Sequence, residues 1–125
     1  MEEHAVFRKC LVEILNDEKD LIVCGQAGDA EEAQRAIDLL KPDLVLVDLS
    51  LPGKCGYELI KEIRAKNREI KLLVISMYDE ALYARGVLRA GGHGYIMKHE
   101  HPDEMLHAMR DVLGGHLYLS DAMLA

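Results

Sequence analysis

Three side chains able to take part in phosphate or metal chemistry each stand at the end of an apolar run. Asp48 follows LVLV, Ser76 follows KLLVI, and Lys98 follows GYIM. A carboxylate at the end of an apolar run is costly unless a cation or a reaction requires it there. An acid, a hydroxyl and an ammonium group in corresponding places therefore predict a shared reactive site.

Two further acids, Glu2 and Glu3, precede the first helical pattern of the chain. Close carboxylates repel one another and tend to take up protons unless a positive charge lies between them. A set of oxygen ligands suits Mg²⁺, which takes one or two carboxylates and keeps several waters. We therefore expect Asp48 to be the reactive group of a metal-assisted site.

The segments that must position these residues alternate between strand and helix patterns. Continuous apolar strands separated by amphipathic helices are typical of an α/β doubly wound fold, in which helices cover both faces of a parallel sheet. Ligands of such sheets bind outside the carboxyl ends of the strands. Strands are predicted at residues 21–27, 44–48, 71–76 and 94–98, and helices at 5–16, 29–41, 79–90 and 102–113, with one more after the turn at 52–53.

Composition limits the classes of protein that need to be considered. The 125 residues form one domain, no apolar run approaches a membrane span, and the net charge of −7 with no basic run argues against direct nucleic-acid binding. The N-terminus lacks the apolar core of a signal peptide. Three cysteines without a C-x-x-C pattern indicate reduced thiols in a cytoplasmic protein, and we expect Cys10 and Cys24 to be buried.

The chain resembles the receiver domains of bacterial two-component response regulators. The motifs EEH, LVDLSLPG, VISM and GYIMK stand in that family's order and spacing, and the resemblance extends over residues 2–119. The wording VDLSLPG and the trailing GGHLYLS look most like the NarL-type subfamily, in which a LuxR-type helix-turn-helix domain usually follows. The resemblance implies a flavodoxin-like parallel sheet and a site that is phosphorylated rather than a site that acts on an external substrate.

The resemblance also assigns roles by position. Asp48 is similar to the phosphoacceptor; Lys98 would pair with the phosphoryl oxygens, and Ser76 would hydrogen-bond to them. Tyr95 matches the switch aromatic, which would turn inward when Ser76 moves toward the phosphoryl group. Mg²⁺ would be held by Glu3, Asp48 and the backbone carbonyl of Ser50, with Glu2 acting through a metal-bound water.

Two departures from the family pattern matter. The acid pair is usually Asp-Asp, so Glu2 and Glu3 predict weakened Mg²⁺ binding. The apolar strand that normally precedes this pair is absent, so we expect a receiver over residues 1–125 that is N-terminally short and lacks its first strand. A start at an internal methionine, a chosen or mistaken start, and a gap filled by another chain all remain open. The sequence predicts an unstable or oligomeric chain, either a homodimer or a swapped oligomer.

The leading functional prediction is a cytoplasmic receiver that accepts phosphate from a sensor histidine kinase and switches dimerisation or an effector. It would reach DNA only through an output domain absent from this sequence, and it would not contact the membrane. The alternatives are a pseudo-receiver that binds partners without cycling phosphate, and an unrelated flavodoxin-like binding domain or hydrolase. No Gly-rich phosphate loop or Ser/His/Asp arrangement favours the last class.

Overall fold

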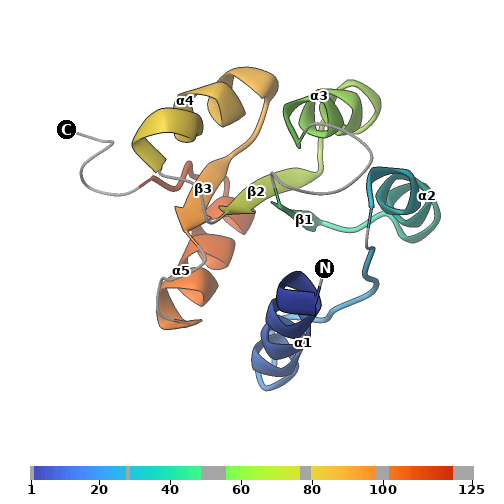
Figure 1. Cartoon of the computed structure of the whole chain (residues 1–125), viewed down its shortest axis with the longest axis vertical. Coiled ribbons are helices and arrows are strands. Elements are labelled where there is room, and N and C mark those ends of the chain that lie inside the picture. The colour runs from blue at the N-terminus through green and yellow to red at the C-terminus, as the bar shows by residue number, and fades with distance from the viewer. Residues whose placement is uncertain (1, 28, 49–55, 77–79, 98–101, 120–125) are drawn as a thin grey trace.

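The computed structural model describes residues 2–27, 29–48, 56–76, 80–97 and 102–119, with side chains described from residue 9 onward except at 56 and 80–82. Helices and strands alternate after two initial helices (Figure 1). The elements are α1 (Glu2–Asn16), α2 (Ala30–Leu40), β1 (Leu44–Asp48), α3 (Gly56–Lys66), β2 (Lys71–Ser76), α4 (Glu80–Ala90), β3 (Gly94–Met97) and α5 (Pro102–Leu113).

The described strands form one parallel sheet in the order β1-β2-β3. Asp48 pairs with Ile75, and Ser76 pairs with Met97, so neighbouring strands end at the same edge. The predictions for residues 44–48 and 71–76 are confirmed, and β3 follows the predicted strand as far as Met97. The α/β class with a parallel sheet is therefore confirmed.

Side chains of the central strand alternate between two apolar layers. Leu72 and Val74 face a cluster that includes residues of α2, α3 and α4, whereas Leu73 and Ile75 face one that includes residues of α1 and α5. Figure 1 shows α3 and α4 on one side of the sheet and α5 on the other. Residues 72–75 are at most 3% exposed, which explains why their sequence is continuously apolar.

The strand predicted at residues 21–27 is wrong. This segment has no strand or helix assignment, and no described strand pairs with the outer edge of β1. Ile22 is 89% exposed, and Cys24 is exposed, as is Cys10 on α1, so the expected burial of both cysteines is also wrong. An apolar, β-branched segment forms a strand only where a neighbouring strand can accept its hydrogen bonds.

Helix termini follow the sequence signals closely. Asp29 accepts a hydrogen bond from the Glu32 backbone N–H at 2.8 Å, as predicted for the cap of α2. Lys41 ends that helix in the left-handed region, with φ of 48°, directly before Pro42. No helix in the part of the chain that the structure describes is long and apolar enough to cross a bilayer.

Beyond α5 the chain comes back to the sheet, a feature that was not predicted from the sequence. We call residues 116–119 the returning segment. Tyr118 forms a parallel bridge with Gly94, so this segment lies along the outer edge of β3. The only hint in the sequence is the alternation of polar and apolar residues in HLYL after the two glycines that end α5.

Candidate functional site

Asp48 and Ser76 occupy the carboxyl ends of adjacent parallel strands, as the sequence predicted. Asp48 is the last residue of β1, and Ser76 is the last residue of β2. The register pairs Asp48 with Ile75, one residue before Ser76. Both side chains are therefore brought to the edge of the sheet where ligands of open α/β folds bind.

The Ser76 side chain is enclosed within the protein. Ser76 is 0% exposed and is the one buried polar residue among those described. No buried side-chain nitrogen or oxygen in the described part of the chain lacks a hydrogen-bond partner. A hydroxyl at the end of a buried strand, next to a half-buried carboxylate, is a suitable donor for an anionic group carried by that carboxylate.

Tyr95 lies inside the core and not on the surface. Its side chain is 1% exposed and belongs to the cluster on the α3–α4 side of the sheet, and Tyr95 pairs with Val74 of β2. The switch role, in which this ring turns inward on activation, stays a prediction. In this structure the ring already lies in the core.

The remaining predicted site residues are placed only in part. Glu2 and Glu3 are the first residues of α1, but their side chains lie outside the described set, as do Ser50 and Lys98 entirely. Lys98 directly follows β3, whose end lies beside that of β2. Among the described side chains, no group of three His, Cys, Asp or Glu could hold a metal. The carboxylate chemistry of Asp48 nevertheless suits an oxygen-binding ion such as Mg²⁺.

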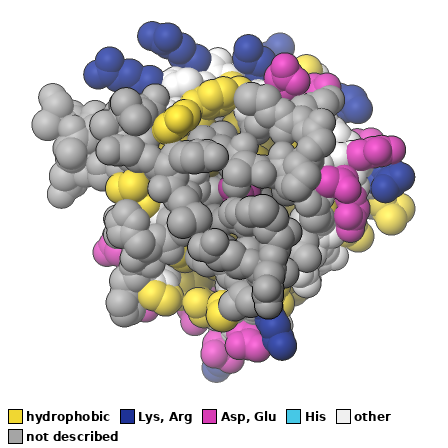
Figure 2. Space-filling view, in the orientation of Figure 1, with side chains coloured by type: hydrophobic (Ala, Val, Ile, Leu, Met, Phe, Trp, Pro, Cys, Tyr) yellow, Lys and Arg dark blue, Asp and Glu magenta, His cyan; other side chains and the backbone are white. Residues whose placement is uncertain are grey.

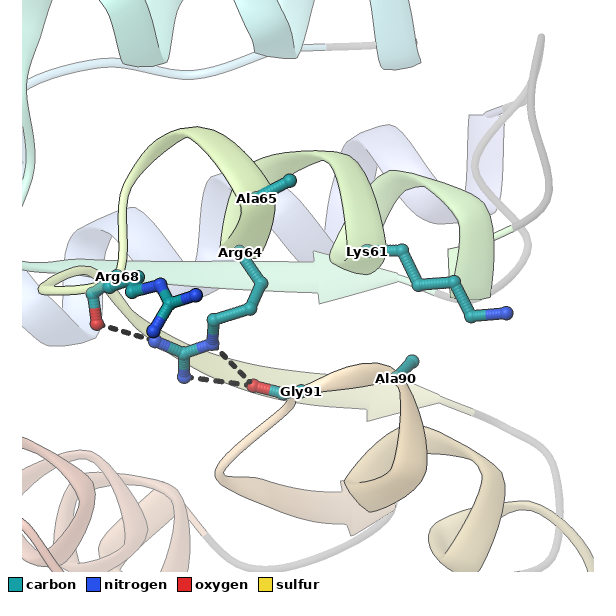
Figure 3. A pocket seen from close by; sticks show the side chains of 6 residues that line it. All are labelled: Lys61, Arg64, Ala65, Arg68, Ala90 and Gly91. Atoms are coloured by element: carbon teal, nitrogen blue, oxygen red, sulfur yellow. Dashed lines mark hydrogen bonds between the residues drawn. The ribbon is translucent and has the colours of Figure 1, made fainter.

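A hollow of about 530 Å³ lies between α3 and α4 and is lined by residues of these helices and of the turns that follow them (Figure 3). The Arg64 guanidinium donates to the Gly91 carbonyl oxygen through Nε at 3.2 Å and Nη2 at 2.9 Å, and Nη1 donates to the Arg68 carbonyl. Arg64 therefore links the loop after α3 to the loop after α4 through hydrogen bonds. The lining residues are Lys61, Arg64, Ala65, Arg68, Ala90 and Gly91.

His93 lies beside the Arg64 guanidinium and was not predicted from the sequence to have a special role. The Leu72 backbone N–H donates to its Nδ1 at 3.1 Å, and Arg64 Nη2 lies 2.7 Å from its Nε2. Burial first, and then the charges of Arg64 and Lys71, lower the pKa of His93 to about 4. In Figure 2 several Lys and Arg side chains stand along the upper margin of the face shown, with Asp and Glu side chains beside them toward the right. The contacts of Arg64 and His93 hold the amino ends of β2 and β3 together, at the end of the sheet opposite to Asp48.

Similarity to known proteins agrees with the arrangement of the strand ends. Residues 1–110 match the response regulator receiver domain family. Oxygen regulatory protein NreC of Staphylococcus haemolyticus (strain JCSC1435) is 37% identical over 119 residues, which are 94% of this chain and 55% of the relative. The chain thus spans about half the length of the curated relatives that it matches.

Solved structures give the same result. A LuxR-family two-component response regulator from Aurantimonas sp. SI85-9A1 superimposes with a TM-score of 0.90 at 29% identity, covering 97% of this chain and 86% of that one. The signal receiver domain of the putative response regulator NarL from Mycobacterium tuberculosis has a TM-score of 0.85 at 28% identity, covering 90% and 91%. With its strand-end aspartate and serine and its NarL- and LuxR-type relatives, the chain belongs to the response regulator receiver domain family.

Proposed function

We propose that the chain accepts a phosphoryl group on Asp48, in an Mg²⁺-dependent reaction, from a sensor histidine kinase. The observation that carries this proposal is the placement of Asp48 and Ser76 at adjacent strand ends. Phosphoryl transfer needs alignment and charge neutralisation more than covalent help from the protein. A carboxylate beside a buried hydroxyl, with Lys98 directly after the next strand, supplies suitable residue types for both.

The residues would divide the work as follows. An oxygen of Asp48 forms a bond to phosphorus while the bond between phosphorus and the donor breaks. Ser76 donates a hydrogen bond to a phosphoryl oxygen, and Lys98 pairs with its charge. Glu3, Asp48 and the Ser50 carbonyl would hold Mg²⁺, with Glu2 acting through a water. When bound, this ion neutralises charge on the phosphoryl oxygens.

The output that follows from this chemistry is regulatory. The acyl phosphate adds about 1.5–2 negative charges to the strand edge, enough to bias a two-state surface. We propose that the change alters self-association or an effector, and that DNA is reached only through a LuxR-type output domain. A cytoplasmic location and the absence of an external substrate follow from the same proposal.

The test is the intact mass of the chain after incubation with acetyl phosphate and Mg²⁺. We expect a gain of one phosphoryl group that is lost with EDTA and in Asp48→Ala. Asp43→Ala is the matched control, because Asp43 precedes the same strand at its other end. A phosphoryl group retained in Asp48→Ala would refute the assignment of the acceptor.

A pseudo-receiver is the second candidate, and the Glu2–Glu3 pair is the observation that favours it. Glu is one methylene longer than Asp, so the metal distances must be recovered by shifts of rotamer or backbone. The same experiment separates the two candidates, because a pseudo-receiver gains no mass at any Mg²⁺ concentration. Glu2→Asp with Glu3→Asp would then test whether the acid pair is the cause.

A further inference from the structure

The returning segment is bound to β3 as a rudimentary fourth parallel strand. The Tyr118 backbone N–H donates to the His93 carbonyl at 3.0 Å, and the Tyr95 N–H donates to the Tyr118 carbonyl at 3.1 Å. β3, α5 and this segment therefore form a strand-helix-strand unit. The chain that leaves the domain is hydrogen-bonded to the same residue, Tyr95, whose ring fills the core.

Side chains hold the returning segment to α5 as well. The Tyr118 hydroxyl donates to Glu104 Oε2 at 3.0 Å, and its ring meets the His107 ring edge-on, with centroids 6.1 Å apart. Leu119 packs against the α3–α4 cluster, and Tyr118 packs against the α1–α5 cluster. The segment thus has two independent sets of attachments, one to α5 and to the core, and one through its backbone to β3.

Gly94 shows how closely the two strands approach. A Cβ atom at this position would lie 2.8 Å from the Tyr118 carbonyl oxygen and 3.1 Å from the Tyr118 Cβ. Only glycine fits without displacing the returning segment. This contact is therefore built into the sequence of β3 and is not a loose approach of the tail.

β3 connects the candidate site to this segment. On one side it pairs with β2, where Ser76 pairs with Met97 and Val74 with Tyr95; on the other it binds Tyr118. If Ser76 is drawn toward a phosphoryl group on Asp48, we expect the carboxyl end of β2 and the paired end of β3 to be drawn toward that group. Because Glu104 and His107 also attach the returning segment to α5, we expect a movement of β3 to be resisted at its backbone bonds to Tyr118.

We propose that the returning segment responds to the phosphorylation state of Asp48, and that phosphorylation loosens the backbone hydrogen bonds between this segment and β3. The inference rests on the proposed phosphorylation and adds the path by which it reaches the C-terminal end. The loosened state frees the outer edge of β3 and changes the direction in which the following chain leaves. One charge at a strand end would thereby control a backbone contact on the far side of the sheet.

Amide hydrogen exchange measured by NMR tests this directly. With excess acetyl phosphate and Mg²⁺, we expect exchange of the Tyr118 amide to accelerate about tenfold or more, the effect of destabilising its protecting bond by about 1.4 kcal/mol. The His93 amide, which donates to the Leu72 carbonyl at 2.7 Å on the β2 side, is the internal control and should not change. Asp48→Ala should show no response.

Intact mass on the same sample separates the two proposals. A phosphorylated chain with unchanged Tyr118 exchange would overturn this inference and leave the proposed function standing. A chain that takes up no phosphoryl group would overturn the proposed function and, with it, this coupling. Equal acceleration at Tyr118 and His93 would also overturn it, because it would indicate general loosening of the sheet.

Reciprocity provides a second test. Because coupling between two sites acts equally in both directions, detaching the segment should favour phosphorylation of Asp48. Tyr118→Pro removes the donor to His93 and also the side-chain contacts of Tyr118 with α5, so it detaches the segment from both β3 and α5. Leu117→Pro controls for the introduction of proline, since among the described residues the Leu117 N–H makes no backbone bond. We expect the ratio of phosphorylated to free chain at limiting acetyl phosphate to rise about fivefold in Tyr118→Pro alone. An equal ratio in two variants with wild-type circular dichroism would contradict the proposal.

Discussion

The two edges of the described sheet differ in whether another segment pairs with them. At β3 the returning segment covers the strand, and Tyr95 beside it is 1% exposed. At β1 no described strand covers the outer side, and the nearby Ile22 is 89% exposed. An open strand edge is a template for further pairing, whereas a covered one is protected. Self-association is therefore expected at β1 and not at β3.

Backbone geometry shows what the β1 edge offers. The Lys71 N–H donates to the Asp43 carbonyl at 2.9 Å. Because parallel strands direct alternate residues to opposite sides, the backbone groups of Leu44 and Leu46 point away from β2. The side chains of both residues are only partly buried and pack against the α1–α5 cluster, as do those of Leu21 and Val23. Within the part of the chain that the structure describes, no strand pairs with this side of β1. Its outward-pointing backbone groups and apolar side chains together form the pattern that accepts a strand.

The largest effect should come from supplying that strand. Five apolar residues placed ahead of Glu2 should raise the melting temperature by about 10 °C and abolish self-association. Burying each side chain contributes about 1.5–3 kcal/mol, and ordering each residue costs about 1–2 kcal/mol. A net gain of a few kcal/mol corresponds to that shift in a small domain. Calorimetry and analytical ultracentrifugation provide the measurements.

The control is an extension of the same length made of Gly and Ser. It should leave the melting temperature and the oligomeric state of the parent chain unchanged. If the parent chain is already a cooperatively melting monomer, and the apolar extension does not stabilise it, the comparison between the edges fails.

A smaller effect, a loss of folding stability, is expected when a substitution pushes the returning segment away from β3. Gly94→Ala should destabilise the fold by about 1–3 kcal/mol, because its Cβ would lie 2.8 Å from the Tyr118 carbonyl oxygen. Gly114→Ala is the matched control, since its nearest neighbours are 3.4–3.6 Å away, an ordinary contact distance. Urea denaturation followed by circular dichroism measures both variants. Equal midpoints would show that the returning segment is not held closely.

The same contrast explains what the sequence could and could not predict. Strand patterns predicted β1 and β2 correctly because both find partners within the chain. The strand predicted at 21–27 from its apolar start LIVC did not form, since pairing depends on a neighbouring strand and not on the segment itself. The site could be predicted as far as Asp48 and Ser76, which end regular strands. Tyr118 could not, because its place is set by tertiary contacts with Gly94 and His93.

His93, whose carbonyl receives the Tyr118 N–H, should make the covered edge sensitive to acid. Its pKa is lowered to about 4 from the ordinary 6.5, first by burial and then by Arg64 and Lys71. The unfolded chain therefore binds the proton more readily, and stability should decline as pH falls from 6.5 toward 4. Above pH 6.5 His93 is neutral in both the folded and the unfolded chain, so it no longer reduces the folding stability. Urea midpoints across the range provide the measurement.

His93→Asn tests the cause, because its Oδ1 can still accept from the Leu72 N–H but does not titrate. We expect the slope of stability against pH to flatten in this variant. The exposed His116, replaced by Asn, is the control for the substitution itself, and the flattened slope should be specific to His93→Asn. A parent chain with no slope between pH 6.5 and 4 would refute the neutral state of His93.

The smallest effect should be at the ion pair between Arg110 of α5 and the loop after α1. Arg110 Nε and Nη2 donate to the two Asp20 carboxylate oxygens at 3.0 Å each, and Nη2 also pairs with Glu18. These hydrogen bonds lower the pKa of Asp20 below its ordinary 3.8, so the contribution is complete above 3.8 and is lost as pH falls below it. The pair is exposed, so salt should screen it.

At low salt only, Arg110→Gln should speed hydrogen exchange of the Glu18 amide, which donates to the Leu15 carbonyl at 3.0 Å. Arg89→Gln on α4 is the matched control, and equal exchange in the two variants would show that α1 is held by its apolar face alone.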